Sequence, residues 1–249
     1  MSVDFDPDFI ELCYQKYNDV LRQKAKTLTK TPRRPKGGDT LLELDSWFQE
    51  ELPKLMQRRE EKYITHEEIS KLMVWKLMRG KFRPRLTEMV QENKPEDVIS
   101  ASKKAFKALP NLSKAISALT VLKAVGPATA SGILAAGAPE HAPFMADESM
   151  LVFPQLQPLD YTLKRYLLYA ELVENQMTDL KGKGSEFDWT PHKLELALWT
   201  SHTAGQLDID IAVKGKAPSE KAGKGVGKKR AASTDTDPQN GNKKSKKRH

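Results

Sequence analysis

The amino-acid sequence predicts an all-α helical bundle followed by a disordered, basic C-terminal tail. Through residues 1–212, apolar side chains recur at the three- and four-residue spacing of helices, and no stretch of useful length alternates as a strand does. Capping residues, glycines and prolines stand where these helices should start and stop. From residue 213 onward large apolar side chains are almost absent, so residues 213–249 cannot bury enough surface to offset their ordering entropy.

The N-terminal quarter of the chain contains two predicted helical stretches. Apolar spacing places the first over residues 9–25. Residues 31–40 hold two prolines and two glycines and are therefore predicted to form a loop. The second helical stretch covers residues 41–62 and is interrupted at Pro53, because proline lacks the backbone N–H that a helix interior needs.

The next helix has the clearest start signal. Thr65 precedes Glu68 at the spacing of a capping box, Ile64 and Ile69 stand at the staple positions, and Gly80 is the expected end. Further helices are predicted from apolar spacing and from prolines that suit a first helical turn. They cover about residues 95–106, 112–123, 127–137, 147–153, 159–177 and 191–199.

The composition limits which metal or cofactor sites are expected and which cellular compartment fits the chain. Cys13 is the only cysteine, so no internal disulfide can form and a reducing, intracellular compartment is expected. One cysteine also excludes a four-cysteine iron–sulfur cluster and the usual structural zinc site, and we expect no metal and no cofactor. The longest apolar stretch is far too short to cross a bilayer and the N-terminus lacks the regions of a signal peptide, so no membrane association is expected.

The formal net charge of +8 is unevenly distributed. Residues 213–249 hold 12 of the 41 Lys and Arg and 3 of the 33 Asp and Glu, which gives them a net charge of +9 and leaves −1 for residues 1–212. The basic pI therefore comes from the tail. A prediction that the helical domain binds nucleic acid must rest on local clusters of charge.

Two basic clusters in the tail are separated by twelve residues. Clusters at this spacing are typical of a bipartite nuclear import signal, so we expect a nuclear location and an import receptor as a partner. The alternative is a solvated polybasic tail that binds any polyanion. The residues concerned are Lys228, Lys229, Arg230, Lys243, Lys244, Lys246, Lys247 and Arg248.

Residues 119–134 are the most informative stretch. Leu119 and Leu122 stand at helical spacing, the turn at Val125-Gly126 follows, and a second helix begins after Pro127. Gly126 has no side chain, so the backbone of the turn can approach another surface. The first N–H groups of a helix lack partners and favour a phosphate, which predicts a sequence-independent grip on a DNA strand. The alternative is an ordinary corner between two helices.

This pattern resembles the helix-hairpin-helix motif of the base-excision DNA glycosylase superfamily. The resemblance covers roughly residues 64–199, with its specific motifs confined to residues 119–147. One departure is Ala124, where the family usually has the first glycine of the turn. The resemblance implies a two-lobed helical fold that grips duplex DNA by its backbone and flips the substrate base into a pocket between the lobes. It also leaves room for a monovalent cation bound at the hairpin.

Asp147 stands where the superfamily has its catalytic aspartate. The resemblance implies that this carboxylate orients water and stabilises positive charge that develops on the sugar. The alternative for Asp147 is a helix N-cap without chemistry. Bifunctional members carry a lysine nucleophile where this chain has Ala128, so any activity should be monofunctional, without a lysine Schiff base.

The densest basic run of the domain covers residues 71–85 and contains no acid. Such a run with interleaved aromatic residues suits phosphate contact, although a solvated helix face explains it equally well. Together the hairpin and this run supply the candidate DNA-binding residues Lys76, Arg79, Lys81, Arg83, Arg85, Lys123, Val125, Gly126, Ala128 and Thr129. Aromatic residues that we test as pocket walls, each also a core candidate, are Trp47, Tyr63, Trp75 and Phe144.

The sequence thus predicts a monomeric nuclear DNA-binding protein of the glycosylase-like helix-hairpin-helix class, in which residues 1–212 form the domain. A monofunctional DNA glycosylase activity would use Asp147. Two alternatives stay open. The protein could keep the fold as a non-catalytic DNA-binding or adaptor protein, or it could be a nuclear protein-interaction domain whose hairpin only packs internally.

Overall fold

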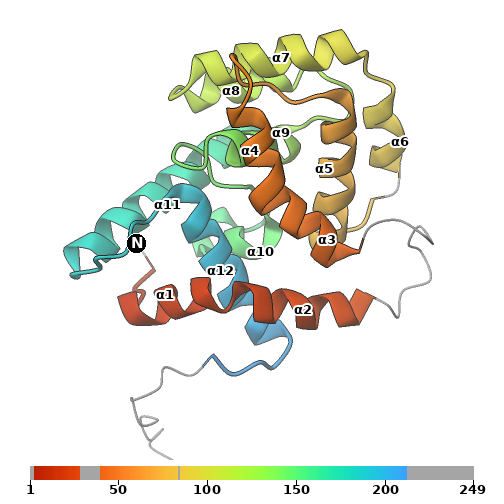
Figure 1. The fold of residues 1–249 in the computed structure, drawn as a ribbon. Coiled ribbons are helices and arrows are strands. Elements are labelled where there is room, and N and C mark those ends of the chain that lie inside the picture. Colours follow the sequence, from red (N-terminus) through yellow and green to blue (C-terminus); the bar gives the residue numbers. More distant parts are fainter. Residues whose placement is uncertain (1–2, 29–39, 84, 212–249) are drawn as a thin grey trace, which may run out of the picture. The chain divides into compact units, whose positions relative to one another are not determined.

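The computed structural model describes residues 3–28, 40–83 and 85–211, all of which belong to the unit Met1–Lys214. Within these ranges the regular structure is helical and contains no strand, which confirms the predicted all-α class (Figure 1). The predicted loop at residues 31–39, the predicted tail and the import signal predicted in it lie outside the described residues.

The helices follow one another with short connections. Several begin at the caps that the sequence predicted. Thr65 and Glu68 form a complete capping box at the start of α5, and Thr190 caps α12 ahead of Pro191. In chain order the helices are α1 (Pro7–Gln15), α2 (Tyr17–Leu28), α3 (Leu41–Ser46), η1 (Trp47–Glu51), α4 (Leu52–Gln57), α5 (His66–Arg79), α6 (Arg85–Gln91), α7 (Pro95–Ala108), α8 (Leu112–Leu119), α9 (Pro127–Gly137), α10 (Asp147–Met150), η2 (Pro154–Leu156), α11 (Leu163–Gly182) and α12 (Pro191–Gln206).

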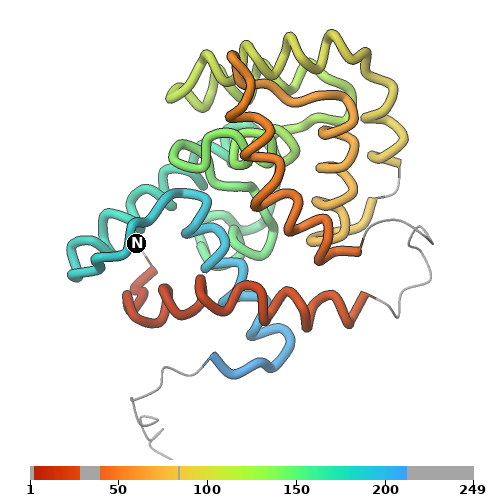
Figure 2. The backbone as a smooth tube through the Cα atoms, in the orientation of Figure 1, coloured from red at the N-terminus to blue at the C-terminus, as the bar shows by residue number. Residues whose placement is uncertain are grey.

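The helices form two groups. In the first, α12 packs against α1, α2, α10 and α11, so both ends of the described chain meet in one lobe (Figure 2). In the second, α5 and α9 pack together and are surrounded by α3, α4, α6, α7 and α8. Contacts of α11 with α8 and α9, and of α2 with α3, join the groups. This two-lobed arrangement agrees with the predicted fold class.

The central helix of the second group is α9. Every residue from Ala128 to Gly137 is buried, so this helix is enclosed on all sides rather than amphipathic. Gly137 is needed for this packing, since a Cβ there would come within 2.5 Å of the Phe106 ring. Because its neighbours enclose this helix, their packing sets the position of its N-terminus.

Several predicted helix boundaries were wrong. The stretch 9–25 is two helices that meet at Lys16, and the stretch 41–62 contains a π-helical turn before Pro53. The helix predicted over 112–123 ends at Leu119. Helix α6 was missed, because its seven residues are too few to show a clear helical period of apolar side chains. Helix α10 is only four residues long, and α11 starts four residues later than expected.

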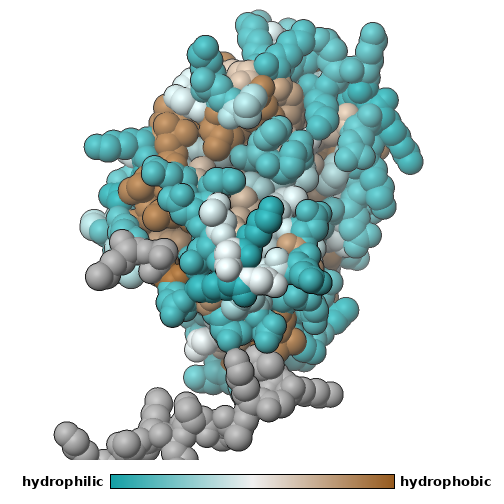
Figure 3. Space-filling view, turned by 90° about the vertical axis from the view of Figure 1, so that its left-hand side faces the viewer, coloured by the Kyte–Doolittle hydropathy of each residue, from teal (hydrophilic) through white to brown (hydrophobic). Residues whose placement is uncertain are grey.

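The surface drawn in Figure 3 is mostly hydrophilic, with scattered apolar side chains. Val121, in the turn between α8 and α9, is the most exposed of the large apolar residues in the described chain, at 76%. No helix in the described ranges combines the length and the apolar character that a membrane span requires.

Candidate functional site

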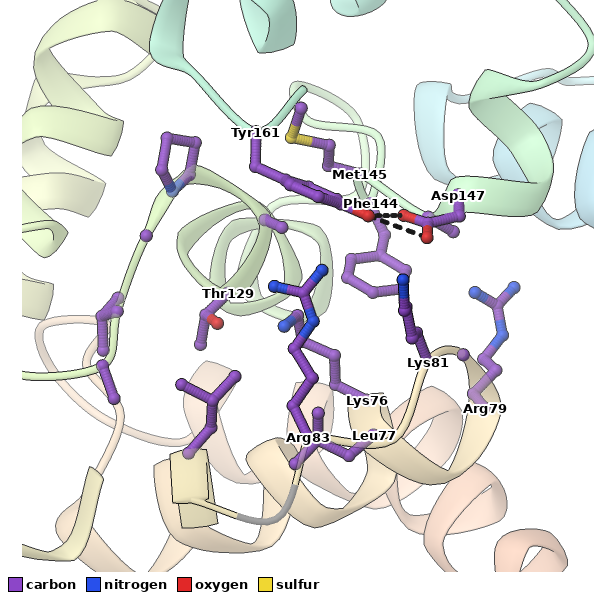
Figure 4. Close-up of a pocket in the computed structure, with 18 of the residues that line it drawn as sticks. Lys76, Leu77, Arg79, Lys81, Arg83, Thr129, Phe144, Met145, Asp147 and Tyr161 are labelled. Atoms are coloured by element: carbon purple, nitrogen blue, oxygen red, sulfur yellow. Dashed lines mark hydrogen bonds between the residues drawn. The ribbon is translucent and has the colours of Figure 1, made fainter. Parts of the chain in front are cut away.

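A pocket of about 380 Å³ lies between the two groups of helices (Figure 4). Three segments form its walls: the end of α5 with the residues after it, the turn before α9, and the segment that leads into α10. The first segment is basic, the second presents backbone, and the third supplies a carboxylate. Residues lining the pocket include Lys76, Lys81, Arg83, Val125, Gly126, Ala128, Thr129, Phe144, Met145, Asp147 and Tyr161.

The turn between α8 and α9 is held by a side chain outside it. Asn93, just after α6, accepts a hydrogen bond from the Lys123 N–H (2.8 Å) and donates one to the Lys123 carbonyl (3.0 Å). The next residue, Ala124, has φ of 64°, a left-handed conformation that glycine adopts readily and that disfavours alanine. The position where the resemblance expects glycine therefore does have a backbone suited to glycine.

Gly126 is the N-cap of α9, and it leaves the N-terminus of that helix open. The backbone N–H groups of Gly126 and Ala128 have no hydrogen-bond acceptor within the described chain. A Cβ added at Gly126 would meet nothing within 4 Å, and its φ of −87° suits any residue. Packing therefore does not require glycine here. What glycine provides is unobstructed access to two free amides, both on residues that line the pocket.

Asp147 is the first residue of α10, and its carboxylate faces the pocket. The Tyr161 hydroxyl lies 2.8 Å from both carboxylate oxygens and donates to them (Figure 4). Ala146, not Asp147, is the N-cap of α10, and no side chain caps this helix, so the N-cap alternative was wrong. The Met145 N–H donates to Ser131 Oγ (2.9 Å), which fixes the segment before Asp147 to α9.

Tyr161 and Arg83 set the electrostatics beside Asp147. Burial and the neighbouring Asp147 carboxylate raise the pKa of Tyr161 to about 12, so its hydroxyl stays protonated and donates to that carboxylate. The Arg83 guanidinium lies 5.1 Å from the centre of the Tyr161 ring. The carboxylate of Asp147 thus has a hydroxyl donor against it and a cation on the far side of that donor's ring.

Lys76, Lys81 and Arg83 form the basic side of the pocket. Lys81 and Arg83 are exposed at its rim, whereas Lys76 is partly buried on α5. Burial, and then the charge of Arg83, lower the pKa of Lys76 to about 8, and Asp147 partly opposes this shift. The pocket thus places cations opposite a carboxylate.

Arg79 was wrongly assigned to DNA binding. Its side chain is only 1% exposed. The guanidinium donates to Glu195 at 3.0 Å and to the Tyr17 hydroxyl at 3.1 Å, and the nearest of the aromatic rings around it is that of Trp199. Although Arg79 borders the pocket, its charge is used inside the core.

Two other basic candidates lie outside the pocket. Lys123 is exposed and pairs with Glu92, and Arg85 is exposed at the start of α6. The pocket-wall prediction is correct for Phe144 and wrong for three aromatic residues. Trp75 stacks on Phe48 in the core, Trp47 is buried beside Lys71, and Tyr63 lies beneath Arg59.

Two residues that matter for the site were missed from the sequence. Tyr161 belongs to an irregular segment fourteen residues after Asp147, and Asn93 is thirty residues from the turn it holds. Neither stands in a local motif, so only the tertiary fold reveals them. In the described chain no group of three His, Cys, Asp or Glu side chains is arranged to hold a metal ion.

Comparisons of this chain with models of protein families, with curated proteins and with solved structures found no match.

Proposed function

We propose that this protein is a nuclear DNA-binding protein of the glycosylase-like helix-hairpin-helix class, and that it hydrolyses the N-glycosidic bond of a damaged base in duplex DNA. The observation that carries the proposal is that three features of the site lie in one pocket. The carboxylate of Asp147 lies in the same pocket as the open N-terminus of α9 and the cations Lys81 and Arg83.

Binding would use the phosphate backbone. The free amides at Gly126 and Ala128 suit a phosphate oxygen, because an unpaired helix N-terminus carries partial positive charge. Exposed Lys81 and Arg83 add full charges at the pocket rim. Contacts of this kind hold a strand without reading its sequence. Lys123 and Arg85, outside the pocket, are left with only a long-range electrostatic part in this proposal.

The pocket has room for a flipped nucleotide. Its volume lies within the roughly 300–1,000 Å³ of ligand pockets. Phe144 and Tyr161 supply ring faces in its wall, and Met145 supplies an apolar side chain. An enzyme that acts on a base must take it out of the duplex, and aromatic and apolar walls hold the extruded base.

Asp147 would supply the chemistry. As the C1′–N bond breaks, positive charge develops on the sugar, and an ionised carboxylate stabilises it. Water then adds its hydroxyl to C1′, and its remaining proton ends on the departing base. The hydrogen bonds from Tyr161 fix the orientation of that carboxylate.

Single-turnover base release tests the proposal. The full chain is assayed on duplexes with uracil, alkylated or oxidised bases. We expect release from at least one duplex and a loss of about 100-fold or more in Asp147→Asn, with duplex binding retained. Asp188→Asn is the matched control, since its exposed carboxylate pairs with Lys193 and does not line the pocket. Full activity in Asp147→Asn would refute the catalytic role.

One observation favours a non-catalytic DNA-binding or adaptor function as the second candidate. Both oxygens of Asp147 lie within hydrogen-bond distance of Tyr161, which leaves fewer sites for an attacking water. No release from any duplex, together with binding that depends on the pocket, would select this candidate.

The nuclear location is tested separately. Alanine at the eight basic residues of the two tail clusters should keep the protein in the cytoplasm, because an import receptor would lose its contacts. Unchanged nuclear accumulation of that variant would contradict the proposed import signal. We propose a monomer as the acting species, which sedimentation of the purified chain would check.

A further inference from the structure

Lys76 is the amine that lies deepest in the pocket. It projects from α5 toward the space enclosed by Thr129, Phe144 and Arg83 (Figure 4). No acceptor in the described chain takes a hydrogen bond from its Nζ, and no carboxylate pairs with it within 4 Å. The other buried cation of this helix, Arg79, is fully paired with Glu195. An unpaired amine in a pocket wall is costly to fold around, and such a group is a candidate for chemistry.

We propose that Lys76 forms an imine with the aldehyde of an abasic deoxyribose held in this pocket, and that the protein thereby cleaves the DNA strand as a lyase. This inference rests on the proposed function, since it requires DNA in the pocket. It departs from the expectation drawn from Ala128. Bifunctional members of the superfamily that this chain resembles carry their lysine at the position of Ala128. Here Lys76 lines the same pocket from a different helix.

The environment of Lys76 suits a nucleophile. Only the unprotonated amine attacks a carbonyl, and burial beside Arg83 lowers the pKa of Lys76 to about 8. At pH 7 about one in ten molecules then carries a neutral amine, against fewer than about one in a thousand for an ordinary lysine. The Asp147 carboxylate in the same pocket is placed to accept a proton.

Each step of the reaction balances. The lone pair of Lys76 Nζ adds to C1′ of the open-chain sugar, and loss of one water gives the protonated imine. Asp147 removes the proton from C2′. The electron pair of that C–H bond forms the C2′–C3′ double bond, and the C3′–O bond breaks with its pair on the departing phosphate. Water then hydrolyses the imine and returns the free amine.

Reductive trapping tests the inference. The full chain is mixed with a duplex that already contains an abasic site, and sodium borohydride reduces any imine to a stable amine. We expect a covalent protein–DNA adduct whose digested peptide carries the sugar on Lys76. Lys76→Arg keeps the positive charge but should form no adduct, and Lys76→Met is the second variant in case arginine does not fit. Lys104→Arg, an exposed lysine on α7 outside the pocket, should trap as well as the wild type.

The pH profile separates a nucleophile from a structural lysine. Trapping by the wild type should rise with pH and level off above about pH 8, where the Lys76 amine is neutral. A rate that still climbs at pH 10 would assign the adduct to ordinary lysines and overturn the inference. An adduct in Lys76→Arg at wild-type yield would also overturn it.

The two proposals fail in different ways. Base release is scored by alkaline cleavage of the product strand, which reveals abasic sites whether or not a lyase acts. Release without any trapped adduct would overturn the role of Lys76 and leave Asp147 hydrolysis standing. A trapped adduct at Lys76 without base release from any lesion would support this inference and overturn the glycosylase proposal.

Discussion

Two clusters of polar side chains meet the C-terminal half of α5, and they are built in opposite ways. In the core cluster, Arg79 donates hydrogen bonds to Glu195 and to the Tyr17 hydroxyl. Asp45 accepts hydrogen bonds from Tyr17 and Trp75. In the pocket cluster, the Lys76 amine has no hydrogen-bond partner among the described residues, and Asp147 accepts from one neutral donor, Tyr161. Arg79 and Lys76 thus lie three positions apart on one helix, and of the two only Arg79 has hydrogen-bond partners in the described chain.

This difference indicates that the core cluster stabilises the fold and that the pocket cluster is available to bind a ligand. A buried ion pair with full hydrogen bonding contributes to a unique core, and loss of one partner is severe. A buried amine without a partner lowers stability, and proteins keep such groups mainly where they act on something. Variants at the two cations should therefore move stability in opposite directions.

Arg79→Met should give the largest effect. It leaves Glu195 buried without its guanidinium, and we expect the free energy of unfolding to fall by about 3–5 kcal/mol. Urea denaturation measures it. The double variant Arg79→Met with Glu195→Leu should recover most of the loss, and Arg83→Met, at the exposed rim, should change stability by less than about 0.5 kcal/mol. Equal losses of unfolding free energy in Arg79→Met and Arg83→Met would contradict the distinction between the core cluster and the pocket cluster.

Lys76→Met should stabilise the protein at pH 7. Its pKa is about 8 in the folded chain and 10.5 in the unfolded chain, so the folded state holds fewer protons between those values and stability rises with pH there. Below pH 8 the buried charge opposes folding, and its removal should add about 1–3 kcal/mol. Denaturation at pH 7 and pH 9.5 should show the advantage of the variant shrinking at the higher pH. A less stable variant at pH 7 would place Lys76 with the core cluster.

Ala124→Gly should also stabilise the protein, but by less than Lys76→Met does. The left-handed backbone at Ala124 disfavours alanine, so glycine should raise the free energy of unfolding by about 0.5–1 kcal/mol. The matched control is Ala170→Gly in the interior of α11, which should lose about 1 kcal/mol. Thermal unfolding of both variants checks the pair, and losses of equal size would contradict the strain at residue 124.

The fold class and several helix starts were predictable because they depend on local patterns. Thr65 with Glu68, and Thr190 with Pro191, are complete signals within four residues. The end of α5 at Gly80 was also predicted, but α6 was not, because seven residues are too few to show a clear helical period. Counting charges also cannot separate Arg79 from Arg83, since the partner of Arg79 lies 116 residues away.

The site was predictable where it depends on contiguous sequence. Gly126, Asp147 and the basic residues Lys76, Lys81 and Arg83 were expected, and all five line the pocket. Tyr161 orients Asp147 from a segment that no sequence pattern links to it. The aromatic residues were mostly misplaced, because composition does not tell a core ring from a pocket ring.

The central claim is that the open N-terminus of α9 binds the DNA backbone. The affinity of the Gly126→Asp variant for duplex DNA tests this claim most directly. Aspartate is a good N-cap, so it should leave stability unchanged or raise it by a few tenths of a kcal/mol. Its carboxylate would occupy the Ala128 amide and repel a phosphate. Measured at low salt on a chain ending at Ala212, affinity should fall by at least about tenfold, or 1.4 kcal/mol. A stable variant that binds duplex as tightly as the wild type would contradict the account.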